Sequence, residues 1–298
     1  MKTNNITVLT CTRDRHDQLK RTMYSCNKVN GFYKHLIIDW NSKTPLVLKN
    51  NEKKDRVIYN VKNENRWWLT RAYNTGFQLV ETEYVLKLDA DVFINFEKFN
   101  KLDFEKYDLI VLNETPNDPG NFLIKKELLD EINGFNEYIW AYGWDDHDLV
   151  LRAKNKLENN KYLDTYGYIN KIPHDNKSRS IVKKNALYKN SDLFFYALIK
   201  AYNNANAFLS TKKLWTKENK LSYTVKENRI LVNHFYNIKE LNFKIKIFYK
   251  YEFLKSFFLI YKAKNRIQKR IFKYLFFIFP TKLLEFLSLR LYPIKINK

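Results

Sequence analysis

The sequence predicts an α/β fold, with a mixed and mainly parallel sheet covered by helices on both faces and a basic helical extension at the C-terminus. Short β-rich runs alternate with helical patterns through the first half of the chain, which is the order that parallel sheets require. Of the 298 residues, 45% are hydrophobic and 16% aromatic, so the chain can bury a large core. This composition excludes a disordered protein.

Five short runs rich in β-branched and other apolar residues are the expected strands. They span residues 6–11, 35–40, 56–61, 84–88 and 108–112. Residues 16–27 and 69–80 carry apolar side chains at helical spacing and are the expected helices. Parallel sheets bind ligands at the carboxyl ends of their strands, so residues 10–15, 39–42 and 89–91 are the expected binding loops.

The spacing of glycines excludes two nucleotide-binding motifs, and the spacing of charged residues excludes a membrane-spanning segment. The chain has six glycines, and the closest two, Gly134 and Gly143, are nine positions apart. That spacing excludes both the GxGxxG dinucleotide fingerprint and the GxxxxGK phosphate loop. The longest stretch without a charged side chain, residues 201–211, has eleven residues, whereas a membrane span needs about 18 apolar residues.

The cysteines and the N-terminal sequence bear on the cellular compartment. Cys11 and Cys26 are too few for a disulfide framework or a four-ligand zinc site. Residues 1–9 contain no long apolar stretch and no signal-peptide cleavage site. We therefore expect a reduced, cytoplasmic protein.

A change in charge density predicts a domain boundary near residue 240. Residues 241–298 hold 14 Lys and Arg against two acids, whereas the preceding residues hold 39 against 30. We therefore expect a main domain in residues 1–240 and a basic amphipathic helical extension in residues 241–298. Such a segment suits the surface of an anionic membrane, and the alternative is a helical cap with solvated lysines that packs on the main domain.

Two aspartates follow the expected strand at residues 84–88. In an extended segment, residues two apart point the same way, so Asp89 and Asp91 can face one point in space. Their carboxylates repel each other unless a cation lies between them, and carboxylate oxygens suit Mg²⁺ or Mn²⁺, which also bridge phosphates. For an isolated Asp-x-Asp, a turn that ends the strand is the simpler explanation.

Three further motifs accompany this acidic pair. They are Arg71-Ala72-Tyr73-Asn74-Thr75-Gly76, Asn133-Gly134-Phe135-Asn136-Glu137 and Gly143-Trp144-Asp145-Asp146-His147-Asp148-Leu149. In this order, over residues 5–175, the motifs resemble glycosyltransferase family 2, whose members have the GT-A fold and bind a nucleotide sugar. The last two motifs look like the acceptor-side region of chondroitin-polymerase-like and β-1,4-galactosyltransferase-like enzymes.

The resemblance implies roles for residues on the donor side. Thr10 and Arg13 match the loop after the first strand, which lines the nucleotide. Asp39 matches the aspartate that reads the uracil edge of the base. Arg71 and Asn74 match the helix beside the base and the diphosphate. A UDP-sugar is therefore the implied donor.

The resemblance also implies a divalent cofactor, Mn²⁺ or Mg²⁺. Asp89 would lie near the ribose and the metal, Asp91 would be a direct metal ligand, and His174 would complete the metal site. The chain departs from the family at two points. Trp40 replaces the usual second acid after Asp39, and two glycines that usually precede the acceptor-side acids are missing.

The acids at residues 145–148 have two interpretations. Asp145 could cap the helix that follows, and the other acids would then complement the positive end of that helix. By the resemblance, Asp146 is the general base that takes the proton of the acceptor hydroxyl, and Asp145 binds an acceptor hydroxyl. Trp144 would stack on the acceptor sugar, although tryptophan is more often a packing residue.

Together these features predict an inverting, metal-dependent hexosyltransferase. It would move galactose or an N-acetylhexosamine from a UDP-sugar to a hydroxyl of a bacterial surface glycan, such as lipopolysaccharide or capsule, on a free or lipid-linked acceptor. Arg13 and Arg71 would stabilise the phosphates. The expected location is peripheral, on the inner face of the cell membrane, and the sequence indicates no oligomeric state.

Three other functions compete with this prediction. A sugar nucleotidyltransferase needs a glycine-rich loop after the first strand, and residues 11–16 contain no glycine. The net charge of +21 would suit a nucleic-acid-binding protein, but the excess lies in the extension and acids lie at the strand ends, so no nucleic-acid partner is expected. A catalytically inactive scaffold with the same fold stays open.

Overall fold

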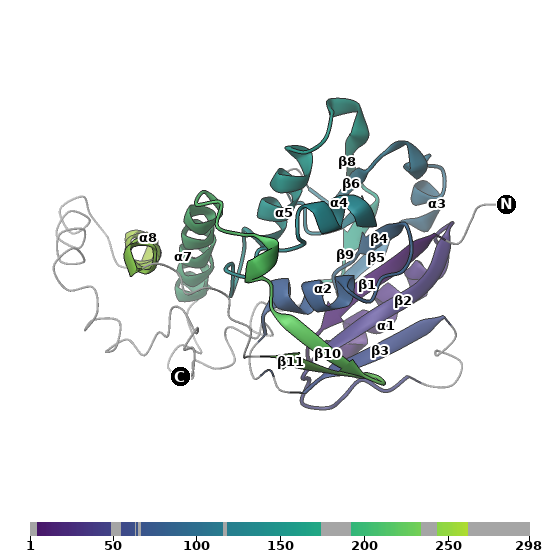
Figure 1. Ribbon diagram of the computed structural model, residues 1–298, viewed down its shortest axis with the longest axis horizontal. Coiled ribbons are helices and arrows are strands. Elements are labelled where there is room, and N and C mark those ends of the chain that lie inside the picture. Colours follow the sequence, from purple (N-terminus) through teal and green to yellow (C-terminus); the bar gives the residue numbers. More distant parts are fainter. Residues whose placement is uncertain are drawn as a thin grey trace. The chain divides into compact units, whose positions relative to one another are not determined.

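The computed structural model of the chain (Figure 1) describes residues 5–48, 55–62, 64, 67–115, 118–173, 192–233 and 243–261. The chain divides into two compact units. The first comprises Met1–Glu137, Asp146–Asp175 and Lys220–Tyr236, and the second comprises Tyr138–Asp145, Asn176–Asn219 and Asn237–Lys298. The boundary expected near residue 240 stays a prediction.

The first unit contains a nine-stranded mixed sheet in the order β10-β11-β3-β2-β1-β4-β7-β6-β8. Its strands are β1 (Ile6–Thr12), β2 (Phe32–Trp40), β3 (Arg56–Val61), β4 (Tyr84–Lys87), β6 (Leu109–Asn113), β7 (Phe122–Lys125), β8 (Tyr162–Tyr166), β10 (Ser222–Lys226) and β11 (Arg229–Asn233). Most neighbouring strands are parallel, but β7 is antiparallel to both β4 and β6, and β10 is antiparallel to β11. The predicted α/β class with a mainly parallel sheet is confirmed.

The five predicted strands correspond to β1, β2, β3, β4 and β6, and the two predicted helices are α1 (His16–Cys26) and α2 (Leu69–Phe77). Helix α2 ends three residues earlier than expected. The N–H groups of Leu79 and Val80 bond to the carbonyls three residues before them, Gly76 and Phe77, which is a tighter turn than an α-helix makes.

Helices α1 and α2 cover opposite faces of the sheet, as β2 shows. Ile37 packs with Leu19 of α1, whereas the next residue, Ile38, faces α2, where a Cβ on Gly76 would lie 3.1 Å from Ile38 Cγ1 and closer still to Leu9. Because successive side chains of a strand point to opposite faces, the two helices must lie on different sides. Gly76 allows the close approach of α2.

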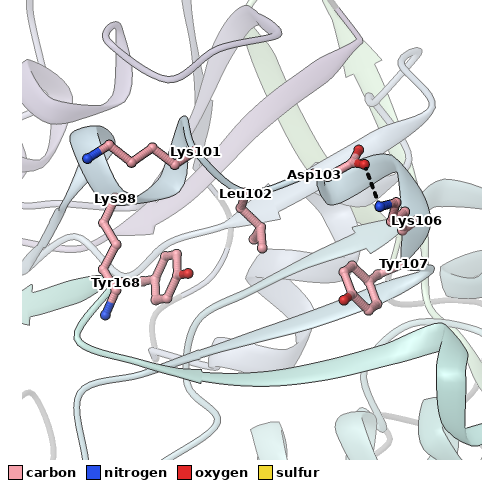
Figure 2. A pocket seen from close by; sticks show the side chains of 7 residues that line it. All are labelled: Lys98, Lys101, Leu102, Asp103, Lys106, Tyr107 and Tyr168. Atoms are coloured by element: carbon pink, nitrogen blue, oxygen red, sulfur yellow. Dashed lines mark ion pairs between the residues drawn. The ribbon is translucent and has the colours of Figure 1, made fainter.

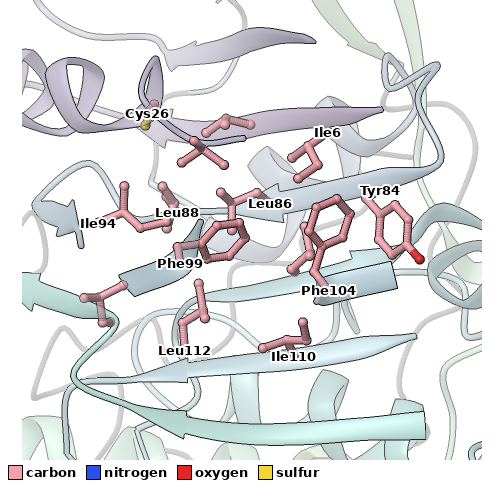
Figure 3. Close-up of a cluster of buried hydrophobic side chains, with 14 of the residues drawn as sticks. Ile6, Cys26, Tyr84, Leu86, Leu88, Ile94, Phe99, Phe104, Ile110 and Leu112 are labelled. Carbon is pink, nitrogen blue, oxygen red and sulfur yellow. The ribbon is translucent and has the colours of Figure 1, made fainter. Parts of the chain in front are cut away.

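The largest described core cluster fills the space beneath β1, β4 and β6 (Figure 3). Strand residues such as Leu86 and Ile110 contact aromatic side chains from α3 (Phe96–Phe99) and from the 3-10 helix η2 (Phe104–Lys106). The rings of Tyr84 and Phe104 meet edge to face, with centroids 5.3 Å apart. This core fixes β4, the strand that leads into Asp89 and Asp91.

The register of the strands brings the expected binding loops to one edge of the sheet. Thr12 pairs with Asp39, and Leu9 pairs with Lys87, so β1, β2 and β4 end close together. Strand β7 runs in the opposite direction, and Phe122 at its start pairs with Lys87. The residue before that strand, Asn121, therefore lies at the same edge as the carboxyl ends of the parallel strands.

Two shorter strands, β5 (Val92–Ile94) and β9 (Ile169–Lys171), form a second, antiparallel sheet beside the Asp-x-Asp segment. Shorter helices complete the first unit: α4 (Lys126–Glu131), η3 (Asn159–Lys161) and α5 (Asp145–Lys154), which begins at the unit boundary.

A pocket of about 320 Å³ in this unit has a basic and aromatic lining (Figure 2). Its residues come from α3, η2, their connections and the β8–β9 turn: Lys98, Lys101, Leu102, Asp103, Lys106, Tyr107 and Tyr168. The ammonium group of Lys106 pairs with Asp103 at 3.0 Å. No predicted site residue lines this pocket, so it is separate from the strand ends discussed above.

The second unit contains the helices α7 (Asp192–Ser210) and α8 (Phe243–Tyr261), together with the 3-10 helix η6 (Lys217–Asn219). Helices α7 and α8 pack on each other, with the rings of Tyr202 and Phe253 4.7 Å apart. Leu254 and Phe257 lie on the buried face of α8, which confirms a helix in the first part of the expected extension. None of the helices within the described ranges is long and apolar enough to cross a membrane.

Candidate active site

A fully buried lysine lies at the edge of the sheet where the expected site residues converge. Lys87 is the last residue of β4, and its Nζ atom lies 2.9 Å from Asp89 Oδ1 and 3.0 Å from Asp146 Oδ1. The same atom donates to the backbone carbonyl of Gly120. We call Lys87, Asp89, Gly120 and Asp146 the Lys87 cluster. It unites the Asp-x-Asp segment with the predicted general base.

Burial alone would lower the pKa of Lys87, but the carboxylates of Asp146 and Asp89 outweigh it and raise that pKa above its ordinary value. Lys87 is therefore charged at neutral pH. The ring of Tyr73 has its centroid 4.7 Å from Nζ, and its hydroxyl donates to the carbonyl of Leu88 at 2.9 Å. Burial raises the pKa of Tyr73, so this hydroxyl stays protonated.

The second aspartate of the segment has a cationic partner as well. Arg15 Nη1 pairs with Asp91 Oδ2, and both side chains are mostly buried. Among the described residues, no group of three or more His, Cys, Asp or Glu side chains is placed to hold a metal ion. His174, the other predicted ligand, lies outside the described residues. The described donor set is thus two carboxylates, each paired with a cation, and a metal at Asp91 would have to displace Arg15.

Two predicted nucleotide contacts are buried in the sheet edge. Thr10 is fully buried, and its Oγ1 lies 2.9 Å from Nε2 of His35 on β2. Asp39 is 1% exposed and accepts the backbone N–H groups of Ser42, at 3.2 Å, and Leu46, at 2.8 Å. Their predicted contacts with a nucleotide stay predictions. Both fix the loops that follow β1 and β2.

The loop after β1 is held against the loop after β2 by two hydrogen bonds. The N–H of Asp14 donates to Ser42 Oγ at 2.9 Å, and Asp14 Oδ1 accepts the N–H of Lys43 at 2.8 Å. Asp14 has a φ of 56°, a left-handed conformation that Asp tolerates better than most residues. Arg13, predicted to line the nucleotide, precedes it in this fixed loop and is half-buried.

His35 gives the first unit a pH-dependent stability. Burial, with a smaller contribution from the charge of Arg56, lowers the pKa of His35 to about 3, whereas an unfolded histidine titrates near ~6.5. Between these values the unfolded chain binds one more proton than the folded chain, so stability falls as pH falls, by about 1.4 kcal/mol per pH unit.

The test is a comparison of urea unfolding at pH 7 and pH 5 for the wild type and His35→Gln. The variant cannot take up this proton in either state, so its free energy of unfolding should decline less steeply over this interval. Identical slopes for the two proteins would contradict the assignment to His35.

Asn74, which is predicted to lie beside the nucleotide, is hydrogen-bonded within the core. Its side chain is fully buried. Its Oδ1 accepts the N–H of Phe135 at 2.7 Å, while Nδ2 donates to the carbonyl of Phe135 and to Glu137 Oε1, both at 2.8 Å. The side-chain amide bonds to both backbone groups of Phe135, as a neighbouring strand would, and to the side chain of Glu137. Asn74 therefore positions the backbone of Phe135, and its predicted contact with the nucleotide stays a prediction.

Arg71 contacts two acids and an aromatic ring. Its guanidinium lies 3.5 Å from the ring centroid of Trp68, and its nitrogens lie 3.5 Å from Glu64 Oε1 and 3.9 Å from Glu137 Oε2. Glu137 also accepts the hydroxyl of Tyr223 on β10 at 3.0 Å, and its burial raises its pKa. The Arg71 side chain is 9% exposed, so it presents little surface to the predicted diphosphate. Tyr223 carries no motif and could not be identified from the sequence.

In the second unit, one asparagine holds the segment that leads to the acceptor-side acids. Asn206 is fully buried, and its Nδ2 lies 2.9 Å from the carbonyls of Trp140 and Gly143 and 3.2 Å from that of Tyr142. Trp144 has a φ of 67°, an uncommon conformation for a large side chain. Asn206 carries no motif, and α7 contains two further asparagines, Asn203 and Asn204, so the sequence alone does not identify it.

Trp144 and Asp145 are half-buried and follow this held segment directly, and Asp145 is the first residue of α5. Asp146 is 16% exposed in its side chain, and Asp148 pairs with Arg152 one turn later at 2.8 Å. The helix therefore places Asp146 in the Lys87 cluster and Asp148 in a separate ion pair.

Two sequence families match the chain. Residues 7–132 match the family described as Glycosyl transferase family 2, and residues 117–175 match the one described as the N-terminal domain of galactosyltransferase. Together the two matches extend from β1 through β9. No curated protein matches the chain.

Several solved glycosyltransferase structures resemble the chain. Staphylococcus aureus TarS 1–349 in complex with UDP-GlcNAc is 13% identical, with 90% of this chain and 78% of that chain covered and a TM-score of 0.51. The catalytic domain of Drosophila β1,4-galactosyltransferase 7 with xylobiose is 15% identical, with coverages of 76% and 92% and a TM-score of 0.45. The mannosyltransferase PcManGT from Pyrobaculum calidifontis, with GDP-Man and Mn²⁺, is 11% identical, with coverages of 98% and 83% and a TM-score of 0.46.

At these identities the likeness to solved structures concerns the fold alone, and it agrees with the mixed sheet described above. The family matches lie over the segments that carry the Asp-x-Asp pair, the Asn74 motif and the acids of α5. The expected resemblance is confirmed: the chain has a GT-A fold, residues 7–132 match glycosyltransferase family 2, and residues 117–175 match the galactosyltransferase N-terminal domain.

Proposed function

We propose that the protein is an inverting, metal-dependent hexosyltransferase that uses a UDP-sugar. The transferred sugar is galactose or an N-acetylhexosamine, and the acceptor is a hydroxyl of a bacterial surface glycan such as lipopolysaccharide or capsule. One observation carries the proposal. The Asp146 carboxylate lies at the start of α5, 3.0 Å from Lys87 Nζ, at the strand end from which the Asp-x-Asp segment departs.

Asp146 acts as the general base in this proposal. Its carboxylate takes the proton from the acceptor hydroxyl as the hydroxyl oxygen attacks the anomeric carbon of the donor. Attack from the side opposite the leaving diphosphate inverts the anomeric centre. Asp145, one residue earlier, binds an acceptor hydroxyl, and Trp144 stacks on the acceptor sugar.

A divalent cation, Mn²⁺ or Mg²⁺, would be held by Asp91 and His174. Ile172 supports this placement, because its N–H donates to the carbonyl of Asp91 at 2.7 Å and His174 is only two residues further along the chain. When bound, such an ion stabilises the negative charge of a departing diphosphate. Arg15, which pairs with Asp91, would then be available to the diphosphate oxygens.

We also propose that α8 contacts an anionic membrane surface at the inner face of the cell membrane. Lys244, Ile247 and Phe248 are exposed at helical spacing on α8, while the opposite face packs on α7. A face that combines cationic and apolar side chains suits the interface of a bilayer. The alternative stays that the extension serves as a cap.

A thermal-shift screen over nucleotide sugars, with and without Mn²⁺, tests the donor and the metal together. A UDP-hexose with Mn²⁺ should raise the melting temperature more than either alone, because only the folded state binds them. Stabilisation without any transfer or hydrolysis would indicate an inactive scaffold. No response to any nucleotide sugar would contradict the proposal.

A further inference from the structure

We propose that Lys87 is a positioning residue, which holds the Asp146 carboxylate in the orientation required of a general base. The proposal rests on the function proposed above and adds a residue that no sequence motif assigns. Lys87 would act only through Asp146, since its fully buried side chain cannot reach a substrate.

The hydrogen bonds of Lys87 leave its ammonium group no alternative arrangement. An ammonium group has three N–H donors. Lys87 has three acceptors within reach: Asp89 Oδ1 at 2.9 Å, Asp146 Oδ1 at 3.0 Å and the carbonyl of Gly120. The stem of the side chain is fixed in β4, which pairs with a strand on each side. The ammonium group is thus a rigid point to which one oxygen of Asp146 is bound.

The charges of the Lys87 cluster explain why the contact between Lys87 and Asp146 is needed. The second oxygens of Asp89 and Asp146 both lie near Gly120, since a Cβ on that residue would be 3.4 Å from one and 3.6 Å from the other. Two carboxylates this near a common point repel each other. The ammonium group of Lys87, which pairs with both carboxylates, offsets this repulsion and holds one oxygen of Asp146.

A purely structural role is the competing explanation. Buried ion clusters stabilise folds weakly, since the loss of hydration of the charges offsets much of their attraction. A structural Lys87 and a positioning Lys87 differ in what its removal changes. The first affects stability and donor binding together, and the second affects turnover while donor binding persists.

The test compares Lys87→Met and Lys87→Gln with the wild type in sugar transfer. With the ammonium group removed, the Asp146 carboxylate is repelled by Asp89 and turns. We expect kcat to fall by about 100-fold, as for other small displacements of a reacting group, while the donor KM stays within about threefold. Lys125→Met is the matched control, because Lys125 is also a strand lysine paired with an acid, Asp108, at 2.7 Å. It should leave kcat unchanged.

A second experiment measures the effect of Lys87→Met on sugar transfer in the Asp146→Asn variant. If Lys87 acts through Asp146, Lys87→Met should cost little further activity in that background. The proposal would be overturned if Lys87→Met lowered kcat equally in both backgrounds, or if the single Lys87 variants left kcat unchanged. It would also be overturned if those variants lost donor affinity together with thermal stability. Failure of both Lys87 variants to fold would overturn it as well. A wild type that transfers no sugar would instead contradict the proposed function itself.

Discussion

Asp146→Asn should greatly slow sugar transfer while leaving the binding of the nucleotide sugar intact. A general base contributes about 10²–10⁴-fold to a reaction rate, so we expect kcat to fall by about 1,000-fold. Asparagine keeps the shape of the side chain, and its amide oxygen can still accept from Lys87, whose Nζ lies 3.0 Å from Asp146 Oδ1. The cluster therefore stays assembled in the variant, and the loss is chemical.

The measurement pairs transfer kinetics with the thermal shift produced by the donor and Mn²⁺. Asp164→Asn is a suitable control, because Asp164 forms an exposed ion pair with Lys154 at the far edge of the sheet, on β8. The control should match the wild type in both measurements. Wild-type turnover in Asp146→Asn would remove the base assignment, and loss of the donor-induced shift would indicate that Asp146 contributes to donor binding instead.

The first half of the sheet could be predicted because its signals are local. Strands β1 to β4 and helices α1 and α2 each carry their own apolar pattern, and the parallel order follows from their alternation. Strand β7 is different. Its four residues read as an ordinary apolar run, and its antiparallel direction depends on pairing with both β4 and β6. The β10–β11 hairpin, which extends the sheet beside β3, likewise depends on contacts distant in the sequence.

Motif spacing indicates the acids of the candidate site but not the cations that pair with them. Motif spacing identified Asp89, Asp91 and Asp146, yet it could not show that Lys87 and Arg15 neutralise them. One signal was available: Lys87 interrupts the apolar run of a central strand, where an uncompensated charge is costly. A charged residue in such a position requires buried partners, and the adjacent acids were the natural candidates.

The Asn74 motif shows a different limit of sequence reasoning. A motif marks a position where one residue type is needed, but it does not say whether that residue faces a ligand or the protein itself. The structure answers through burial and hydrogen bonds, since the Asn74 amide is fully buried against Phe135 and Glu137. Asn74 thus holds Phe135 and Glu137, which belong to the acceptor-side motif, through hydrogen bonds in the core.

Asn74→Ala should therefore destabilise the first unit by about 3 kcal/mol or more. The substitution removes three hydrogen bonds and leaves the N–H and the carbonyl of Phe135 buried without their partner, at about 1–3 kcal/mol for each such group. It also removes one of the donors to the buried carboxylate of Glu137, whose pKa is already raised by burial. Urea unfolding measures the loss of stability. The control is Asn170→Ala, at an exposed position of β9.

The two possible roles of Asn74 predict opposite patterns in this experiment. A residue that contacts the nucleotide would, when shortened to Ala, weaken donor binding and leave the stability of the free protein nearly unchanged. A residue that holds the backbone of Phe135 lowers the free energy of unfolding first, and the donor still binds to the fraction that stays folded. Unaltered stability in Asn74→Ala, combined with lost donor binding, would restore the nucleotide contact that the motif suggested.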